Sequence, residues 1–401
     1  MKFRGSWGLT GNQEIDPRAQ HTIFEPRYAT QSIFTFNQDN GTAYDINGNN
    51  SGQLPSGFAK AQTGNPDLKW ETSESINFGV DFGLFDDKFT GSIEYYVKET
   101  RDILTSTQPV ATEGEGANRF INAGTVENSG LELVLGFSDS FNIGKEALHC
   151  SINYNMATMS NKVKELPLHV QNQFGGNGDD QTIIGRNVNS VYGYVADGLF
   201  QSQAEVDAHA AQSGAAPGRI RFKDLNEDGV VDDKDQKYFT VTSPDLLYGL
   251  NIDMTYGAFD FNIFFQGVYG SQAVNGWKLF TDFTSINAGS NYGQRTLNAW
   301  TPENTNTDVP ALTTVDNNNE WRVSTFRYED QSYAKLRNIS VGYSLSESVL
   351  SKLGLYEARI YMAGQNLFTL KSKDTHMQDP ETPTAGFPIP RRYSLGLNLT
   401  F

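Results

Sequence analysis

The C-terminal segment from Arg391 to Phe401 alternates strictly between two kinds of side chain. Its odd-numbered positions from Tyr393 onward are apolar or aromatic, whereas the positions between them are polar or small. Successive side chains of a β-strand point to opposite faces, so the segment predicts a strand with one apolar and one polar face. About ten residues is the length of a tilted strand that crosses a bilayer, whereas strands in soluble sandwiches are usually nearer five or six residues.

The same period of two recurs along the whole chain. We expect about ten strands, near residues 2–10, 75–84, 89–98, 131–137, 148–156, 248–256, 259–265, 339–345, 359–370 and 391–401. Short connections fall near 85–88, 139–145, 257–258 and 346–356, and long ones near 11–68, 105–123, 162–243, 271–331 and 371–390. Short periplasmic turns that alternate with long extracellular loops are typical of outer-membrane barrels.

This alternation assigns each connection to one side of a membrane. If the connection 346–356 is periplasmic, Phe401 also ends in the periplasm, and residues 162–243 form one long extracellular excursion. The strand-like stretch 188–200 (VNSVYGYVADGLF) is then loop structure rather than a further barrel strand. The sequence therefore predicts an all-β fold whose strands cross a membrane.

Composition excludes several classes of protein. A transmembrane helix needs about 18 consecutive apolar residues, and the chain has no such run. The net charge of -16 argues against nucleic-acid binding, which requires basic patches. Cys150 is the single cysteine, so the chain cannot build a disulfide framework or a cysteine-based zinc site. We expect Cys150 to be a small buried or lipid-facing hydrophobic residue.

The N-terminal residues 1–8 (MKFRGSWG) lack the apolar core and cleavage site of a signal peptide. They already have the pattern of a strand. Since an exported protein carries a signal, we expect this chain to be the C-terminal part of something longer.

Several motifs carry a family resemblance. They are residues 64–72 (GNPDLKWET), 122–133 (NAGTVENSGLEL), 218–229 (GRIRFKDLNEDG), 265–270 (FQGVYG), 335–343 (KLRNISVGY) and 364–368 (GQNLF). In this order they resemble the SusC/RagA group of TonB-linked outer-membrane proteins of Bacteroidetes, over nearly the whole chain.

The resemblance implies a large β-barrel with an N-terminal plug, which is coupled to TonB in the inner membrane. It implies a SusD-like surface lipoprotein as partner and the import of oligosaccharides or peptides, with no enzymatic activity. Transporters of this class have 22 strands and a plugged lumen. Residues 1–401 are therefore expected to be the C-terminal barrel portion of such a receptor in contact with outer-membrane lipid, with the signal peptide, TonB box and plug absent. The terminal Phe401 is expected to be a signal for the barrel-assembly machinery.

The best local motif lies at residues 224–235, inside the long loop 162–243. It has oxygen ligands at positions 1, 3, 5, 9 and 12, a glycine at position 6 and a backbone carbonyl at position 7, which is the spacing of a calcium loop. The candidate Ca²⁺ ligands are Asp224, Asn226, Asp228, Val230, Asp232 and Asp235. The motif resembles the dockerin-type variant, since the preceding 219–222 predicts a strand. The alternative is a surface loop held by Asx-turns without metal.

Catalysis finds no support, because the five histidines are scattered and no hydrolase, metalloprotease or nucleotide-binding pattern is present. Aromatic loop residues are candidates for stacking on a substrate. They are Phe174, Tyr192, Trp277, Tyr292 and Trp300. The favoured alternative is that each packs within its own long loop.

Three functions remain open at this point. The first is the barrel component of a SusC/SusD-type importer. The second is a passive porin-like barrel, and the third is a soluble, calcium-binding and carbohydrate-binding β-protein. The residues themselves do not distinguish a glycan from a peptide.

Overall fold

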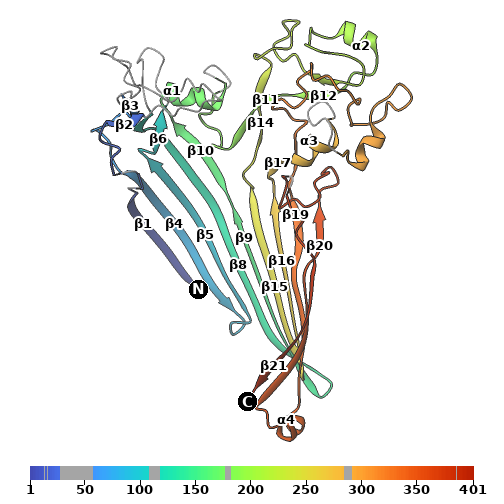
Figure 1. Cartoon of the computed structure of the whole chain (residues 1–401). Helices are drawn as coiled ribbons and strands as arrows, with labels where there is room; N and C mark the ends of the chain where they lie inside the picture. Colours follow the sequence, from blue (N-terminus) through green and yellow to red (C-terminus); the bar gives the residue numbers. More distant parts are fainter. Residues whose placement is uncertain are drawn as a thin grey trace, which may run out of the picture.

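The computed structural model describes residues 1–12, 14–15, 17–27, 57–107, 118–176, 182–283, 291–384 and 386–401. Its framework is one 11-stranded sheet of antiparallel strands, which we call the wall. The strands follow the order β1-β4-β5-β8-β9-β15-β16-β19-β20-β21, with β10 paired to β8 beside this path. The sheet does not close, since β1 and β21 lie at its two edges (Figure 1).

The wall strands are long. They are β1 (Lys2–Asn12), β4 (Glu71–Leu84), β5 (Phe89–Arg101), β8 (Thr125–Ile143), β9 (Glu146–Thr158), β10 (Ser160–Glu165), β15 (Leu246–Tyr256), β16 (Phe259–Tyr269), β19 (Tyr333–Ser344), β20 (Glu357–Lys371) and β21 (Arg392–Thr400). All ten predicted strands are confirmed in these elements.

The two faces of the wall differ in polarity. Strand register places Ile152, Ile252, Ile263 and Ile339 directly across from one another on one face. Asn153 and Asn251 form the neighbouring row on the other face. Cys150 lies on the apolar face opposite Met254, as expected for a lipid-facing residue. The two-residue period of the sequence thus becomes an apolar outer surface and a polar inner surface.

One predicted connection is much shorter than expected. The sequence predicts a connection near 139–145, and Asp139 interrupts the apolar row of β8 there. Lys88 Nζ lies 2.8 Å from Asp139 Oδ2, which provides a partner for the carboxylate on the apolar face. The strand continues to Ile143, and the turn consists of Gly144 and Lys145, with Gly144 at a positive φ of 67°.

Smaller elements fill the long connections. Two-stranded sheets form from β2 (Ile23–Arg27) with β3 (Gly57–Gln62), β6 (Leu104–Thr107) with β7 (Arg119–Asn122), β11 (Ser190–Tyr194) with β14 (Gln236–Val241), β12 (Ala196–Leu199) with β13 (Ile220–Phe222), and β17 (Gln272–Val274) with β18 (Tyr328–Asp330). Because β11 and β12 lie outside the wall, the prediction that 188–200 is loop structure is confirmed.

The helices are short. They are α1 (Leu168–Gln171), η2 (Asn172–Phe174), α2 (Gln203–Ala208), α3 (Gly276–Thr281), η4 (Gln294–Asn298) and α4 (Glu347–Leu353). In the described ranges, none of them is long and apolar enough to cross a membrane. All except α4 lie at the end of the wall where the long connections gather (Figure 1).

Candidate functional site

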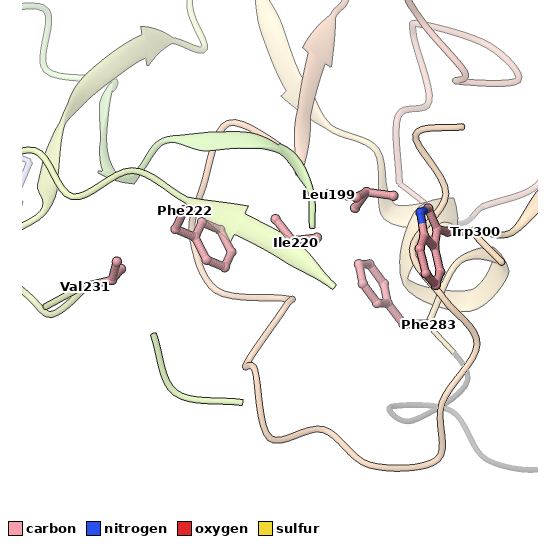
Figure 2. Close-up of a cluster of buried hydrophobic side chains, with 6 residues drawn as sticks. All are labelled: Leu199, Ile220, Phe222, Val231, Phe283 and Trp300. Carbon is pink, nitrogen blue, oxygen red and sulfur yellow. The ribbon is translucent and has the colours of Figure 1, made fainter. Parts of the chain in front are cut away.

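Three long connections, β10–β15, β16–β19 and β20–β21, pack together at one end of the wall, and we call this assembly the outer loop unit. It contains a hydrophobic cluster whose members come from two connections, as Figure 2 shows. The buried members are Leu199, Ile220, Phe222 and Val231 from the β10–β15 connection and Phe283 and Trp300 from the β16–β19 connection. Burial of a large apolar side chain contributes about 1.5–3 kcal/mol. The cluster therefore joins two segments that the sequence separates widely.

A buried ion pair joins the same two connections. Arg219 Nε donates to Glu320 Oε1 at 3.0 Å, and the two side chains are only 7% and 2% exposed. The same Glu320 oxygen accepts the backbone N–H of Ile220 at 3.0 Å. Gln212 Nε2 donates to Asn318 Oδ1 at 2.7 Å beside this pair. Paired charges with hydrogen-bonded partners are the form in which burial of charge is tolerated.

Glu329 of β18 ties a third connection, between β20 and β21, to the unit. Its carboxylate lies 2.8 Å from Lys278 Nζ, accepts from Asn275 Nδ2 at 3.0 Å, and accepts the backbone N–H of His376 at 2.8 Å. Burial by itself would raise the pKa of Glu329. The nearby Lys278 ammonium and the donated hydrogen bonds outweigh burial and lower the pKa to about 2.

The same connection also binds the polar face of the wall. Lys335 of β19 is 1% exposed, and its Nζ lies 2.8 Å from Asp379 Oδ2 and 2.6 Å from Glu381 Oε2. Arg337 also pairs with Glu381, and Arg337 Nε donates to Gln266 Oε1 at 3.0 Å. Arg337 is the extra residue of a β-bulge in β19, which places these groups together. Residues near Asp379 and Glu381 therefore lie against the inner surface of the wall.

Amides and charges line the polar face below this point, and the sequence analysis did not single them out. Asn262 Nδ2 donates to Asn251 Oδ1 at 3.0 Å and to Asp253 Oδ1 at 2.7 Å, and Asn338 Nδ2 donates to Asn262 Oδ1 at 3.0 Å. Arg359 Nε donates to Asp260 Oδ1 at 2.8 Å nearer the other end of the strands. The signal that could have found them is the polar position in each alternating segment, once strand register is known.

The acidic loop 224–235 has several contacts of a calcium loop. Gly229 at position 6 has a φ of 87°, and its N–H donates to Asp224 Oδ2 at 2.8 Å. Asn226 Oδ1 accepts from the N–H of Asp228 at 3.1 Å, which forms an Asx-turn. The other oxygen of Asp224, Oδ1, is buried and has no hydrogen-bond partner. The predicted strand before the loop is confirmed as β13.

Other contacts show that the loop does not hold its ligands around one point. Asp235 is fully buried, but its oxygens accept backbone N–H groups from Leu225 at 2.7 Å and Asp232 at 2.8 Å. Lys234 Nζ lies 3.7 Å from Asp228 Oδ2 and 3.8 Å from Asp232 Oδ2. Across the described part of the chain, no group of three acidic, histidine or cysteine residues is arranged to hold a metal. The oxygen ligands and the unpartnered Asp224 Oδ1 fit Ca²⁺. To bind it, the loop 224–235 would have to close so that its ligands surround one point.

The aromatic candidates do not form one site. Tyr192 packs edge-on against Tyr238 at 5.0 Å between ring centroids, and the Tyr238 hydroxyl donates to the carbonyl of Phe174 at 3.2 Å. Trp277 is half-buried in α3, and Tyr292 is exposed. Trp300 is 8% exposed in the hydrophobic cluster, and its Nε1 donates to Gln201 Oε1 at 2.9 Å. Phe401 is exposed beyond the end of β21.

Comparison with known proteins decides the family. The family model described as TonB dependent receptor-like, beta-barrel, matches residues 22–367. The chain belongs to this family. It is therefore a β-barrel protein of the outer membrane and not an enzyme, and the apolar face of the wall is the face toward lipid.

Curated relatives of this TonB-dependent receptor family cover the whole chain. TonB-dependent receptor P3 of Formosa agariphila is 32% identical, and TonB-dependent receptor SusC of Bacteroides thetaiotaomicron is 27% identical. The chain spans only 39% and 37% of the length of these two relatives. The solved structure of the RagAB peptide transporter has the same fold, with a TM-score of 0.75, 20% identity, and coverage of 100% of this chain and 40% of that chain.

Proposed function

We propose that residues 1–401 form the C-terminal barrel portion of a TonB-dependent importer of large nutrients, oligosaccharide or peptide. The importer works with a SusD-like surface lipoprotein and draws energy from TonB. The observation that carries the proposal is the family match over residues 22–367. The amide-rich inner face and the outer loop unit support it, because large polar solutes need hydrogen-bonding walls and a wide external surface.

The experiment uses the complete receptor in its own cells. Deletion of the receptor gene should abolish growth on one nutrient class, supplied either as oligosaccharide or as peptide, and the receptor gene should restore growth only in cells with functional TonB. An affinity tag on the receptor should co-purify a surface lipoprotein. Growth that continues without TonB would favour the passive porin and overturn the proposal.

We further propose that the acidic loop 224–235 binds Ca²⁺ in a structural role. Asp224, Asn226, Asp228 and Asp232 would supply side-chain oxygens, Val230 a carbonyl and Asp235 a closing carboxylate. The unpartnered Asp224 Oδ1 and the left-handed Gly229 support this proposal. Ca²⁺ should slow proteolytic cleavage within 224–235, Asp224→Ala should remove the effect, and Asp207→Ala in the neighbouring α2 should retain it. Equal cleavage with Ca²⁺ and with a chelator would overturn it.

A further inference from the structure

The connection between β19 and β20 lies at the end of the wall away from the outer loop unit (Figure 1). Among the described connections at that end, it is the one that forms a helix. This helix, α4, begins after the N-cap Ser346 and ends at Gly354, which has a left-handed φ of 68°. None of its residues is buried. A helix that protein contacts do not cover must find its stabilisation elsewhere, because isolated short helices are marginal in water.

The side chains of α4 separate into two faces. Each helical residue turns by about 100°, so Val349, Leu350 and Leu353 fall within one apolar arc of about 100°. Glu347, Ser348, Ser351 and Lys352 occupy the rest of the circumference. Val349 and Leu353 are 40% and 58% exposed and Leu350 is half-buried, so most of the apolar arc is not covered by the protein.

The connection that carries α4 is attached beside the lipid-facing surface of the wall. Ala358 and Leu399 are strand partners on the apolar face, yet Ala358 is 3% exposed and Leu399 is 41% exposed. The connection 345–356 begins and ends here, since the N–H of Leu345 donates to Ala358 and the N–H of Tyr356 donates to Thr400. These two bonds attach both ends of the connection to the strand pair that carries Ala358 and Leu399 on the apolar face. Tyr356, 79% exposed, follows the helix at the same level.

We propose that α4 is an interfacial membrane anchor whose apolar arc is inserted into the periplasmic leaflet of the outer membrane. The occupant of the arc is lipid, because both ends of the connection that carries α4 are attached to strands whose apolar face is the lipid face of the wall. Amphipathic helices bind in this way, with the apolar face about 5–10 Å into the boundary between headgroups and acyl chains. Lys352 on the polar side contacts anionic headgroups, and Tyr356 lies at the headgroup level, where aromatic residues with a polar tip are enriched. The anchor fixes the depth of the C-terminal hairpin in the bilayer.

The experiment places one environment-sensitive probe on each face of the same helix. The complete receptor, in a Cys150→Ser background, carries Leu353→Cys or Ser351→Cys labelled with nitrobenzoxadiazole and is reconstituted in phosphatidylethanolamine–phosphatidylglycerol vesicles. We expect blue-shifted emission at position 353, with quenching by lipids brominated in their acyl chains. The probe at 351 should instead be quenched by aqueous iodide. Heat-modifiable migration confirms folding, and Val349→Cys replaces Leu353→Cys if that variant does not fold.

Two results would overturn the proposal. Equal iodide quenching at 351 and 353 would mean that the arc is in water. Protection of position 353 without quenching by brominated lipid would mean that a protein surface, such as a second copy or another part of the receptor, covers the arc. The proposal depends on the membrane wall and not on import, so a receptor that fails the nutrient experiment can still pass this one.

Discussion

Arg219 and Glu320 form a buried ion pair across 101 residues of sequence, with Nε and Oε1 3.0 Å apart. The pair joins two connections of the wall into one outer loop unit. Removal of one partner from a buried pair leaves an uncompensated charge and typically costs about 3–5 kcal/mol. Glu320→Ala should therefore destabilise the outer loop unit by about this amount.

This effect should be confined to the loops. Limited proteolysis of the complete receptor should show faster cleavage within 199–231 and 291–327 in Glu320→Ala, while heat-modifiable migration of the barrel is retained. The matched control is Lys223→Ala, which removes an exposed contact with Asp197 at 3.7 Å. Exposed pairs contribute about 0–1 kcal/mol, so the control should behave like the wild type. Equal cleavage in both variants would contradict the prediction.

Protonation of the Glu329 carboxylate should loosen the β20–β21 connection in acid. Its pKa is lowered from 4.5 in the free state to about 2 in the folded state. A lowered carboxylate pKa contributes stability that is fully present above the free value and is lost as pH falls through the folded value. Residues 375–383 should thus remain bound at neutral pH and loosen between pH 4.5 and about 2.

Hydrogen exchange measured across that pH range would test this statement. Glu329→Gln cannot pair with Lys278, so its residues 375–383 should exchange faster at pH 7 and lose the part of their pH dependence that comes from Glu329. The control is Glu303→Gln, at an exposed position of the β16–β19 connection that also carries Glu329. It should keep the wild-type exchange profile. A wild-type profile that is flat down to pH 2 would refute the role of Glu329.

Lys335 attaches the same β20–β21 connection to the inner surface of the wall. Lys335→Met keeps much of the buried aliphatic chain but leaves Asp379 and Glu381 without their ammonium partner, with only Arg337 to balance them. We expect residues 378–382 to become accessible, measured as faster labelling of a cysteine placed at Pro380. Lys88→Met is the control. Lys88 is about half exposed and pairs with Asp139, and its replacement should leave the labelling at position 380 unchanged. Slow labelling in Lys335→Met would show that the ion pairs do not hold the connection.

The sequence predicted the wall well because strand faces follow a local rule. Ile252 and Asn251 can be assigned to opposite faces from their positions alone. The outer loop unit was not predicted in the same way, since each aromatic was expected to stack on a substrate or to pack within its own loop. Trp300 and Phe283 instead pack with Leu199 and Ile220 from another connection, and irregular segments carry no period that reveals such pairing. The bulge at Arg337 likewise depends on strand register.

Gly130 of β8 is a wall position where an added side chain would meet neighbouring backbone. A Cβ built there would lie 2.1 Å from the backbone oxygen of Thr158 and 2.8 Å from the ring of Tyr96. The tyrosine can move, but the backbone at Thr158 is fixed, because Thr158 also accepts the N–H of Leu131 through its hydroxyl at 2.8 Å. Gly130→Ala should therefore cost about 1–3 kcal/mol, the usual penalty for overpacking.

Gly8 of β1 gives the matched control, since a Cβ there meets no atom within 4 Å. Urea titration of the receptor in detergent, followed by heat-modifiable migration, should show a lower midpoint for Gly130→Ala and an unchanged midpoint for Gly8→Ala. Gly130→Ala combined with Tyr96→Ala should recover only part of the loss, because the clash with Thr158 remains. Full recovery in the double variant would show that the ring, and not the backbone, sets the limit at this position.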